Sequence, residues 1–410
     1  MARFIKIPNV IKTFGNSMYP LLLDGDVLYL KKVSFSGIKT NDIITVRERD
    51  HYYTHRVIFK AKNYLVTKGD NAFHTDTRVH PHNIVGMVEN VKRGKDIFNP
   101  EQLYLMQSSL YFSEIINIKN ELELNRIGLV FLKGLPLHLY FEKAHPRRLY
   151  ADCDILIKRQ DFPKVKAVLK GFGYKKAKTD LSEEHQKLKG KESEISYYKR
   201  LNGFYVTFDI HFEIVFLMTQ LGELNLLYPQ TVIDSLTEEF ISKKRTIRVS
   251  GENFPILSKD HLSVYLCLHL FHHNFKGAYR YDFIDTILKK DNPSPKELIK
   301  VIKKYRLDNF VYPCLMLLRK YYLTPLPKTL IASIKPSGVL SSYIEKNLLK
   351  TDILNEGDRI GGGIRRFSII FFLSPYPIYK KLFIFTNPEV LYSIFWVMEK
   401  KLLGLFKPYE

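Results

Sequence analysis

The sequence predicts a multidomain protein with a mainly-β N-terminal domain, an α+β domain and a helical C-terminal region. Three observations lead to this fold class. The chain has 410 residues, too many for one typical hydrophobic core. Short β-branched runs fill residues 1–90, and a mixture of strand and helix patterns follows them. Helical spacing dominates from residue 258 to about residue 323. We therefore expect domains at 1–95, 96–255 and 256–410.

The N-terminal domain is predicted from strand-like runs separated by Gly, Asp and Asn. The runs are DVLYLK at 26–31, DIITV at 42–46, HRVIF at 55–59 and YLVT at 64–67. The basic segment KRGKDIFNPE, residues 92–101, contains Gly and Pro and indicates a domain boundary.

The second and third regions show longer patterns. A helix is expected over 102–124, followed by the strands VFLKG, CDILI and YVTFDIHFEI and by a short helix in DFPKVKAVLKGFGY. Ser258-Lys259-Asp260 is a helix start signal for the helical region. The pattern of residues 391–406 predicts an amphipathic helix. We expect this helix to dock on the preceding domain, and the alternative is that it lies at a membrane interface.

The amino-acid composition indicates which cellular compartment and which kinds of partner suit the protein. The 63 Lys+Arg against 42 Asp+Glu give a formal charge of +21, which favours anionic partners, although a generally Lys-rich composition explains it equally well. Nucleotide phosphates and an anionic membrane surface are the candidates, and nucleic acid is not favoured. The three cysteines have no paired spacing, which excludes a disulfide framework. No signal peptide or run of about 18 apolar residues occurs. We expect a cytoplasmic protein, with peripheral membrane contact as the alternative.

The N-terminal domain contains the residue types of a serine nucleophile site. Ser17 lies in GNSMYP, His55 in HYYTHRVI, and Asp70 and Asp76 in TKGDNAFHTD. A serine becomes nucleophilic when a base removes its proton and a third group orients that base. A serine after Gly-Asn is more often a simple turn residue, so the hypothesis depends on the other three residues.

These four segments resemble the successive motifs of type I signal peptidases and LexA-like self-cleaving repressors, over residues 12–95. The resemblance implies Ser17 as nucleophile, His55 as general base and Asp76 as the orienting acid, with Asp70 as a supporting or alternative acid. It also implies a coiled β-fold that binds a peptide or precursor protein as an added strand. Gly15 stands where the family often has a hydroxyl residue that helps to stabilise the oxyanion.

A second group of candidate site residues consists of aspartates. Asp152 and Asp154 are two residues apart at a predicted strand, so their side chains point to one face. Asp209, from the strand YVTFDIHFEI, can supply a third carboxylate. Three carboxylates provide the oxygen ligands that Mg²⁺ requires beside a nucleoside triphosphate. The alternative is a chance Asp-x-Asp pair.

Residues from about 125 to beyond 320 resemble the uncharacterised nucleotidyltransferases of the DNA polymerase β-like superfamily. The resemblance rests on the LKG turn, the Arg before the Asp-x-Asp pair, the Asp-x-His strand and the LCLHLFHH…YDFIDTILKK block. It implies Asp152, Asp154 and Asp209 as metal ligands and Lys133 and Gly134 as nucleotide-binding residues, with Mg²⁺ and a nucleoside triphosphate as cofactor and substrate. In the helical block, we expect His269 and His273 to pack or contact substrate rather than bind zinc, and Asp282 and Asp285 to lie on a helix surface or cap.

Three functions follow from the sequence. The leading one is a serine endopeptidase of signal peptidase type that needs no cofactor, fused to an Mg²⁺-dependent nucleotidyltransferase. The second is primarily a nucleotidyltransferase with a degenerate, peptide-binding N-terminal domain. The third is a non-catalytic scaffold.

Overall fold

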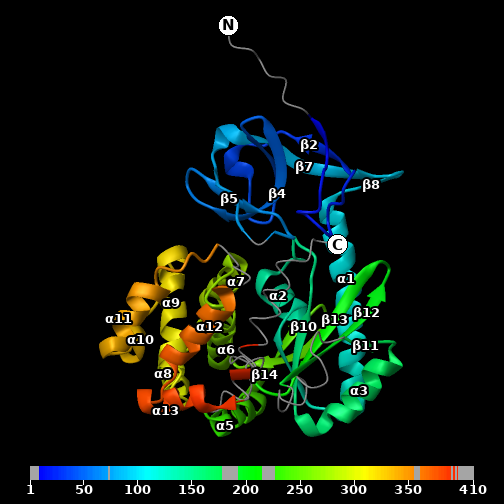
Figure 1. The fold of residues 1–410 in the computed structure, drawn as a ribbon. Helices are drawn as coiled ribbons and strands as arrows, with labels where there is room; N and C mark the ends of the chain where they lie inside the picture. Colours follow the sequence, from blue (N-terminus) through cyan, green and yellow to red (C-terminus); the bar gives the residue numbers. More distant parts are fainter. Residues whose placement is uncertain are drawn as a thin grey trace.

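The structure, a computed structural model, describes residues 9–72, 74–177, 193–214, 227–354, 361–388, 391–392 and 395. The expected helix over 391–406 therefore falls almost entirely outside the described residues. Figure 1 shows an N-terminal β-region above, an α/β region at the lower right and a helical region at the lower left.

The N-terminal region is an antiparallel sheet of short strands. Their order is β1-β2-β7-β3-β4-β5-β6, and β8 pairs with β7. The strands are β1 (Val10–Lys12), β2 (Val27–Lys31), β3 (Ile43–Glu48), β4 (His51–Lys60), β5 (Leu65–Lys68), β6 (Arg78–Val79), β7 (Ile84–Arg93) and β8 (Asp96–Phe98). The run expected at 55–59 is the second half of β4, so His55 lies in mid-strand.

Helix α1 (Pro100–Leu124) leads from the first sheet to the second (Figure 1). It starts where the sequence places helix-start chemistry: Asn99 accepts a hydrogen bond from the Glu101 backbone, and Pro100 occupies the first helical position. Buried residues recur along one face of α1, including Tyr111, Ile115 and Ile118. That face packs on the second region.

The second region contains a mixed sheet with the order β11-β12-β13-β10-β9-β15-β14. Its strands are β9 (Leu129–Lys133), β10 (Cys153–Ile157), β11 (Lys175–Lys176), β12 (Glu194–Leu201), β13 (Phe204–His211), β14 (Lys244–Val249) and β15 (Glu252–Leu257). The pairs β10–β13 and β15–β9 are parallel, and the other pairs are antiparallel. The accompanying helices are α2 (Leu135–Glu142), α3 (Phe162–Gly171) and α5 (Gln230–Ser242).

The C-terminal region is helical, as the sequence predicts. Its helices are α6 (Lys259–His272), α7 (Ala278–Asp291), α8 (Pro295–Lys304), α9 (Asp308–Tyr322), α10 (Lys328–Ile334), α11 (Gly338–Tyr343), α12 (Gly361–Leu373) and α13 (Ile378–Leu382). Ser258 caps α6 by accepting a hydrogen bond from the His261 backbone. Within the described ranges, none of the helices has the length and apolar character that a membrane crossing requires.

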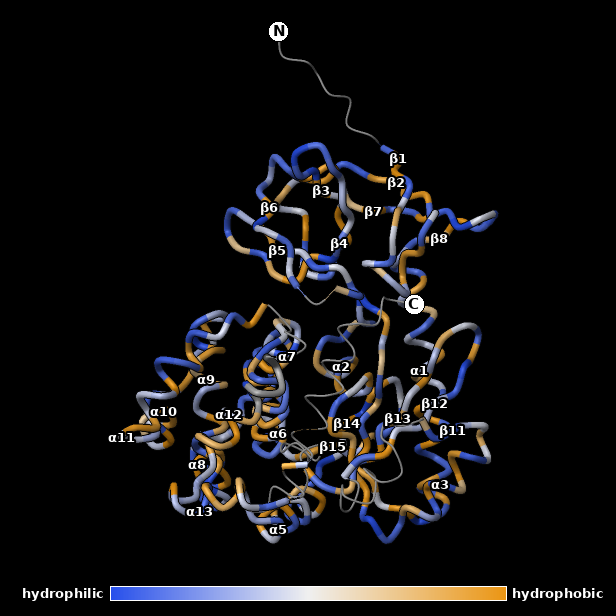
Figure 2. Tube along the Cα trace, in the orientation of Figure 1, coloured by the Kyte–Doolittle hydropathy of each residue, from blue (hydrophilic) through white to orange (hydrophobic). Residues whose placement is uncertain are grey.

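The buried hydrophobic residues of the described chain form one large cluster and two smaller ones. One large hydrophobic cluster runs from α1 through the second sheet into the helical region. Two smaller clusters lie in the first sheet, and one of them includes Tyr104 of α1. Figure 2 shows the corresponding hydrophobic stretches along the strands and helices of both parts. The α/β and helical regions therefore form one packed unit.

Candidate functional site

Three adjacent strands in the middle of the second sheet bring the predicted acidic residues together. Asp154 of β10 lies in register with Asp209 of β13 on one side and with Lys133 of β9 on the other. Partners in register place their side chains on the same face of a sheet. Oxygen atoms of Asp152, Asp154 and Asp209 all lie within 4.8 Å of one another. The acidic constellation predicted from the sequence thus forms one compact group.

Lys133 lies inside this group. Its Nζ is 2.5 Å from Asp154 Oδ2 and 3.1 Å from Asp152 Oδ2. Burial alone would lower the pKa of Lys133, but Asp154 and then Asp152 outweigh it and hold the pKa well above its usual value. The lysine, expected to face a triphosphate, therefore carries its positive charge directly against two of the candidate metal ligands.

Gly134 links β9 to α2 with a backbone conformation that favours glycine. Its φ is +113°, and an added Cβ would lie 3.4 Å from the Cα of Cys153. This turn lets α2 begin immediately beside the acidic group, at the end of the strand that carries Lys133.

The surroundings of Asp154 and Asp209 shift the pKa values of these two carboxylates in opposite directions. Burial tends to raise the pKa of Asp154, yet Lys133 and the hydrogen bond with His211 hold it below its usual value. His211 Nε2 lies 2.9 Å from Asp154 Oδ1. For Asp209, burial and then the Asp154 charge raise the pKa to about 7. One carboxylate is thus held ionised while its neighbour titrates near neutral pH.

The group suits a divalent cation bound by oxygen. It offers carboxylate oxygens from three residues, which Mg²⁺ prefers over nitrogen or sulfur ligands. Asp152 is partly exposed whereas Asp154 is buried, so the group is reached from one side. Asp152, Asp154 and Asp209 are the residues that would hold the ion.

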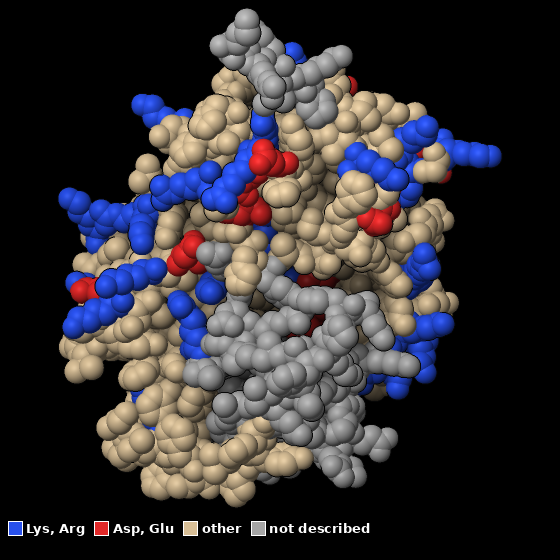
Figure 3. All heavy atoms as spheres, turned by 45° about the horizontal axis from the view of Figure 1, so that its top comes forward, with Lys and Arg blue, Asp and Glu red and all other residues tan. Residues whose placement is uncertain are grey.

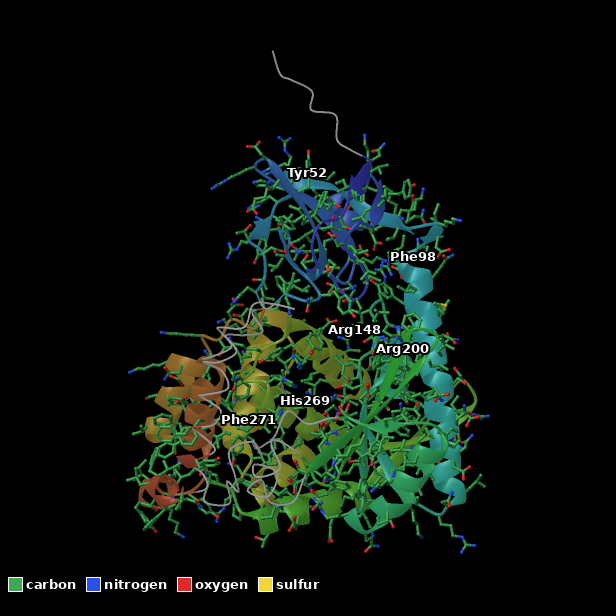
Figure 4. All side chains as sticks on the ribbon, turned by 45° about the vertical axis from the view of Figure 1, so that its right-hand side comes forward. Tyr52, Phe98, Arg148, Arg200, His269 and Phe271 are labelled. Atoms are coloured by element: carbon green, nitrogen blue, oxygen red, sulfur yellow. The ribbon has the colours of Figure 1, made fainter. Side chains whose placement is uncertain are left out.

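A cleft of about 430 Å³ opens beside the acidic group. Lys133, Gly134 and Asp152 line it, and helices α2, α6 and α7 supply further walls. Asn41, from the first sheet, also contributes to the lining. In Figure 4, Arg148 lies between the N-terminal region and the rest of the molecule, with His269 deeper below it.

Planar cations and aromatic rings alternate along one side of the cleft. The Arg148 guanidinium lies over the rings of Tyr150 and Tyr279, at 5.7 and 4.8 Å from their centroids. Arg280 lies over Tyr279 at 4.4 Å. Such stacked guanidinium groups can bind phosphate through their edges.

Three of the histidines and acids noted on helices α6 and α7 line the cleft: His269, His273 and Asp282. His269 and His273 line the cleft with their Nε2 atoms 3.3 Å apart. Burial, then Lys133 and His273, lowers the pKa of His269 well below its usual value. Asp282 also lines the cleft, whereas Asp285 is buried and accepts a hydrogen bond from Thr324. Asp282 is exposed, in keeping with the expected helix-surface position, whereas a surface or capping role for Asp285 is wrong, because packing of α7 against the rest of the molecule buries it.

In the first sheet, Ser17, His55 and Asp76 form a hydrogen-bonded chain. His55 Nε2 is 3.0 Å from Ser17 Oγ, and His55 Nδ1 is 2.7 Å from Asp76 Oδ2. Thr67 donates a second hydrogen bond to Asp76. Ser17 is exposed, while the neighbouring Met18 is buried and anchors the turn. The order of contacts is that of a serine nucleophile, its base and an orienting acid.

Asp70 has a different partner from the one expected. Both of its carboxylate oxygens accept hydrogen bonds from Arg56, at 2.7 and 2.6 Å. A buried guanidinium thus holds the Asp70 carboxylate, and Asp76 is the acid that contacts His55. Gly15 has φ +83° and an open surrounding, as suits the turn before Ser17.

Sequence reasoning assigned no role to His211, Arg56 or Arg148. The Asp-x-His spacing offers a signal for His211, because residues two apart on a strand share a face. Arg148 is one of the two arginines before the Asp-x-Asp pair, a part of the family-like pattern, and it stacks on the nearby Tyr150. Arg56 gains its partners from segments distant in sequence, so the local pattern contains no signal for it.

Comparison with known proteins identifies the larger part of the chain. The profile of a family described as uncharacterised nucleotidyltransferase matches residues 96–322, more than half of the sequence. The chain therefore belongs to the uncharacterised nucleotidyltransferase family. No curated protein and no solved structure matches it. The resemblance of residues 12–95 to signal peptidases gains no support from these comparisons.

Proposed function

We propose that this protein is an Mg²⁺-dependent nucleotidyltransferase whose acidic centre is Asp152, Asp154 and Asp209. The observation that carries the proposal is the convergence of the three carboxylates within 4.8 Å, inside the matched family region. A nucleoside triphosphate is the donor and an acceptor hydroxyl the nucleophile. The acceptor oxygen bonds to the α-phosphorus, the bond to the bridging oxygen breaks, and pyrophosphate leaves.

The residues of the site divide this work between them. Bound by the three carboxylates, Mg²⁺ would supply positive charge beside the triphosphate. Lys133 offers a second, fixed positive charge next to Asp154. Asp209, whose carboxylate lies beside that of Asp154, is the candidate to accept the acceptor's proton. Arg148 and Arg280 can hold the phosphates or flat groups of the substrate in the cleft.

Transfer of a label from α-labelled nucleoside triphosphates tests this proposal. We expect Mg²⁺-dependent labelling by the native chain and its loss in Asp154→Asn and Asp209→Asn, because each removes a carboxylate from the centre. Asp161→Asn, an acid that lies just before α3 and outside the cleft, is the matched control. Equal transfer by all four proteins contradicts the proposal.

We propose a serine hydrolase of the peptidase type as a second activity, at Ser17. The observation in its favour is the hydrogen-bonded order Ser17–His55–Asp76. The exposed side chains of Phe14 and Tyr19 beside Ser17 offer apolar contacts to a peptide or precursor bound as an added strand. Because Gly15 provides no hydroxyl, oxyanion stabilisation would rest on backbone N–H groups.

Covalent labelling with a fluorophosphonate tests the second activity. Ser17 is the expected labelled residue, and Ser17→Ala should abolish labelling and peptide cleavage. His55→Ala should lower cleavage by about 10³-fold or more, because the base is lost. Ser36→Ala, another exposed serine of the same domain, should retain both. Labelling that persists in Ser17→Ala contradicts this assignment.

A further inference from the structure

The first sheet and the transferase cleft are joined by one segment, residues 143–152. This segment connects α2 to β10 and carries Arg148, Tyr150 and Asp152 into the cleft. Its other contacts are with helix α1, where Gln107 hydrogen-bonds the Tyr150 backbone, and with the N-terminal region. Arg147 Nη2 is 2.6 Å from Asp42 Oδ1, and Leu149 packs against the core cluster of the first sheet.

Arg56 makes the central contact of this junction. It is only 6% exposed, and its Nη1 donates to the backbone oxygens of Arg147 and Asn41, both at 3.1 Å. The same Nη1 contacts the Tyr104 hydroxyl of α1 at 3.0 Å. Burial by itself would lower the pKa of Arg56, but Asp70 and Tyr104 outweigh it and raise the pKa. The guanidinium thus remains charged while it joins four separate segments, those of Asn41, Asp70, Tyr104 and Arg147.

Through its ion pair with Asp70, Arg56 is also connected to the turn that carries Ser17. Asp70, the bidentate partner of Arg56, lies between Gly69 and Asn71. The Asn71 backbone donates to Ser17 O at 2.8 Å, and a Cβ on Gly69 would lie 2.6 Å from the same oxygen. Arg56 is therefore held by the first sheet on one side and holds the cleft segment on the other.

We propose that Arg56 is a positioning residue for nucleotidyl transfer, and that the N-terminal region is thereby part of the transferase. This inference rests on the proposed transferase function. By holding the backbone at Arg147, Arg56 orients the next residues, Arg148 and Asp152, toward the cleft. A small misplacement of such groups costs a large factor in rate, since binding and transfer need defined geometry.

Arg93 provides a matched control for a test of this role. It also forms a bidentate pair with a buried acid of the first sheet, Asp26, at 2.9 and 2.8 Å. Its further contacts are with Leu21 O and the Phe98 ring, and its hydrogen bonds and ion pair join it to Asp26 and Leu21 rather than to residues 143–152. Loss of Arg93 therefore removes a comparable ion pair from the same region without releasing the cleft segment.

Steady-state transfer kinetics with Mg²⁺ and a nucleoside triphosphate provide the test. We expect Arg56→Met to raise KM for the nucleotide by about tenfold or more relative to Arg93→Met, with a smaller fall in kcat. Arg56→Lys should restore part of the loss, because it keeps a charge for Asp70. Ser36→Ala, at an exposed serine of the N-terminal region that does not line the cleft, should leave both constants unchanged. Equal constants for Arg56→Met and Arg93→Met overturn the proposal.

A double-mutant comparison tests whether Arg56 affects nucleotide transfer by positioning Arg148. If Arg56 acts through Arg148, then Arg56→Met adds little to Arg148→Met, whereas the effects of Arg93→Met and Arg148→Met multiply. Independent multiplication for the Arg56 pair overturns the proposal.

Amide hydrogen exchange tests the positioning of residues 143–152 by Arg56 without depending on transferase activity. Exchange of residues 143–152 should rise in Arg56→Met and stay unchanged in Arg93→Met. If the native chain transfers no nucleotide, the transferase proposal fails, while this exchange pattern still supports positioning of the segment by Arg56. Unchanged exchange in Arg56→Met overturns the positioning itself.

Discussion

Asp154 is the side chain on which the candidate transferase centre depends most directly. It is 2% exposed, and its two oxygens contact Lys133 and His211. A buried carboxylate is stable when cations and hydrogen-bond donors surround it. These contacts keep Asp154 ionised and leave Asp209 as the carboxylate of the group that titrates near neutral pH.

His138 gives a prediction at the same scale. Burial, and then the charge of Arg148, lower its pKa to about 4. Because an unfolded histidine titrates near 6.5, stability from neutral His138 is complete above pH 6.5 and is lost as pH falls toward 4. In His138→Gln, the midpoint of thermal unfolding should therefore change less between pH 7 and pH 4.5 than in the native chain. The exposed His82→Gln is the control variant, and an unaltered pH dependence in His138→Gln contradicts the prediction.

Single residues also show what a sequence can and cannot predict. Alternation along CDILI and YVTFDIHFEI correctly predicts strands that carry Asp154 and Asp209. The family resemblance implies Asp76 as the orienting acid and leaves Asp70 as a supporting or alternative one, because both lie in one short segment. The choice between the two acids is decided by Arg56 and His55, whose side chains reach that segment from β4.

At the scale of elements, the centre depends on the pairing of β9, β10 and β13. The order of these strands and their register place Lys133, Asp154 and Asp209 side by side. The sequence predicts each strand but not this register, because pairing between distant segments is set by packing of the whole sheet. The position of Lys133 against the acids is therefore a result that only the structure provides.

The turn between β9 and α2 yields an element-scale prediction. Gly134→Ala should lower the free energy of unfolding by about 1–2 kcal/mol, because φ is +113° and the new Cβ meets Cys153. Gly128→Ala, where φ is not in the left-handed region and nothing lies within 4 Å, is the matched control. Denaturant titrations of both variants measure the difference. Equal stabilities contradict the strain assigned to Gly134.

At the scale of the whole molecule, two candidate centres lie in one chain and share a junction. The large core joins the matched family region to the helical region, while the first sheet keeps its own smaller cores. Tyr104 and Leu149 extend the first sheet's packing into the second region, and Arg56 adds a polar link. Lys and Arg side chains are spread over the face in Figure 3 rather than collected in one patch.

The most direct test of the central claim is Mn²⁺ binding, followed by electron paramagnetic resonance with and without a nucleoside triphosphate. Mn²⁺ replaces Mg²⁺ at carboxylate sites and is observed itself, so the measurement requires no knowledge of the acceptor. We predict that the native chain and Asp161→Asn bind Mn²⁺ in the presence of nucleotide, and that Asp154→Asn and Asp209→Asn lose this binding. Equal binding by all four proteins would contradict the assignment of Asp152, Asp154 and Asp209 as the metal centre.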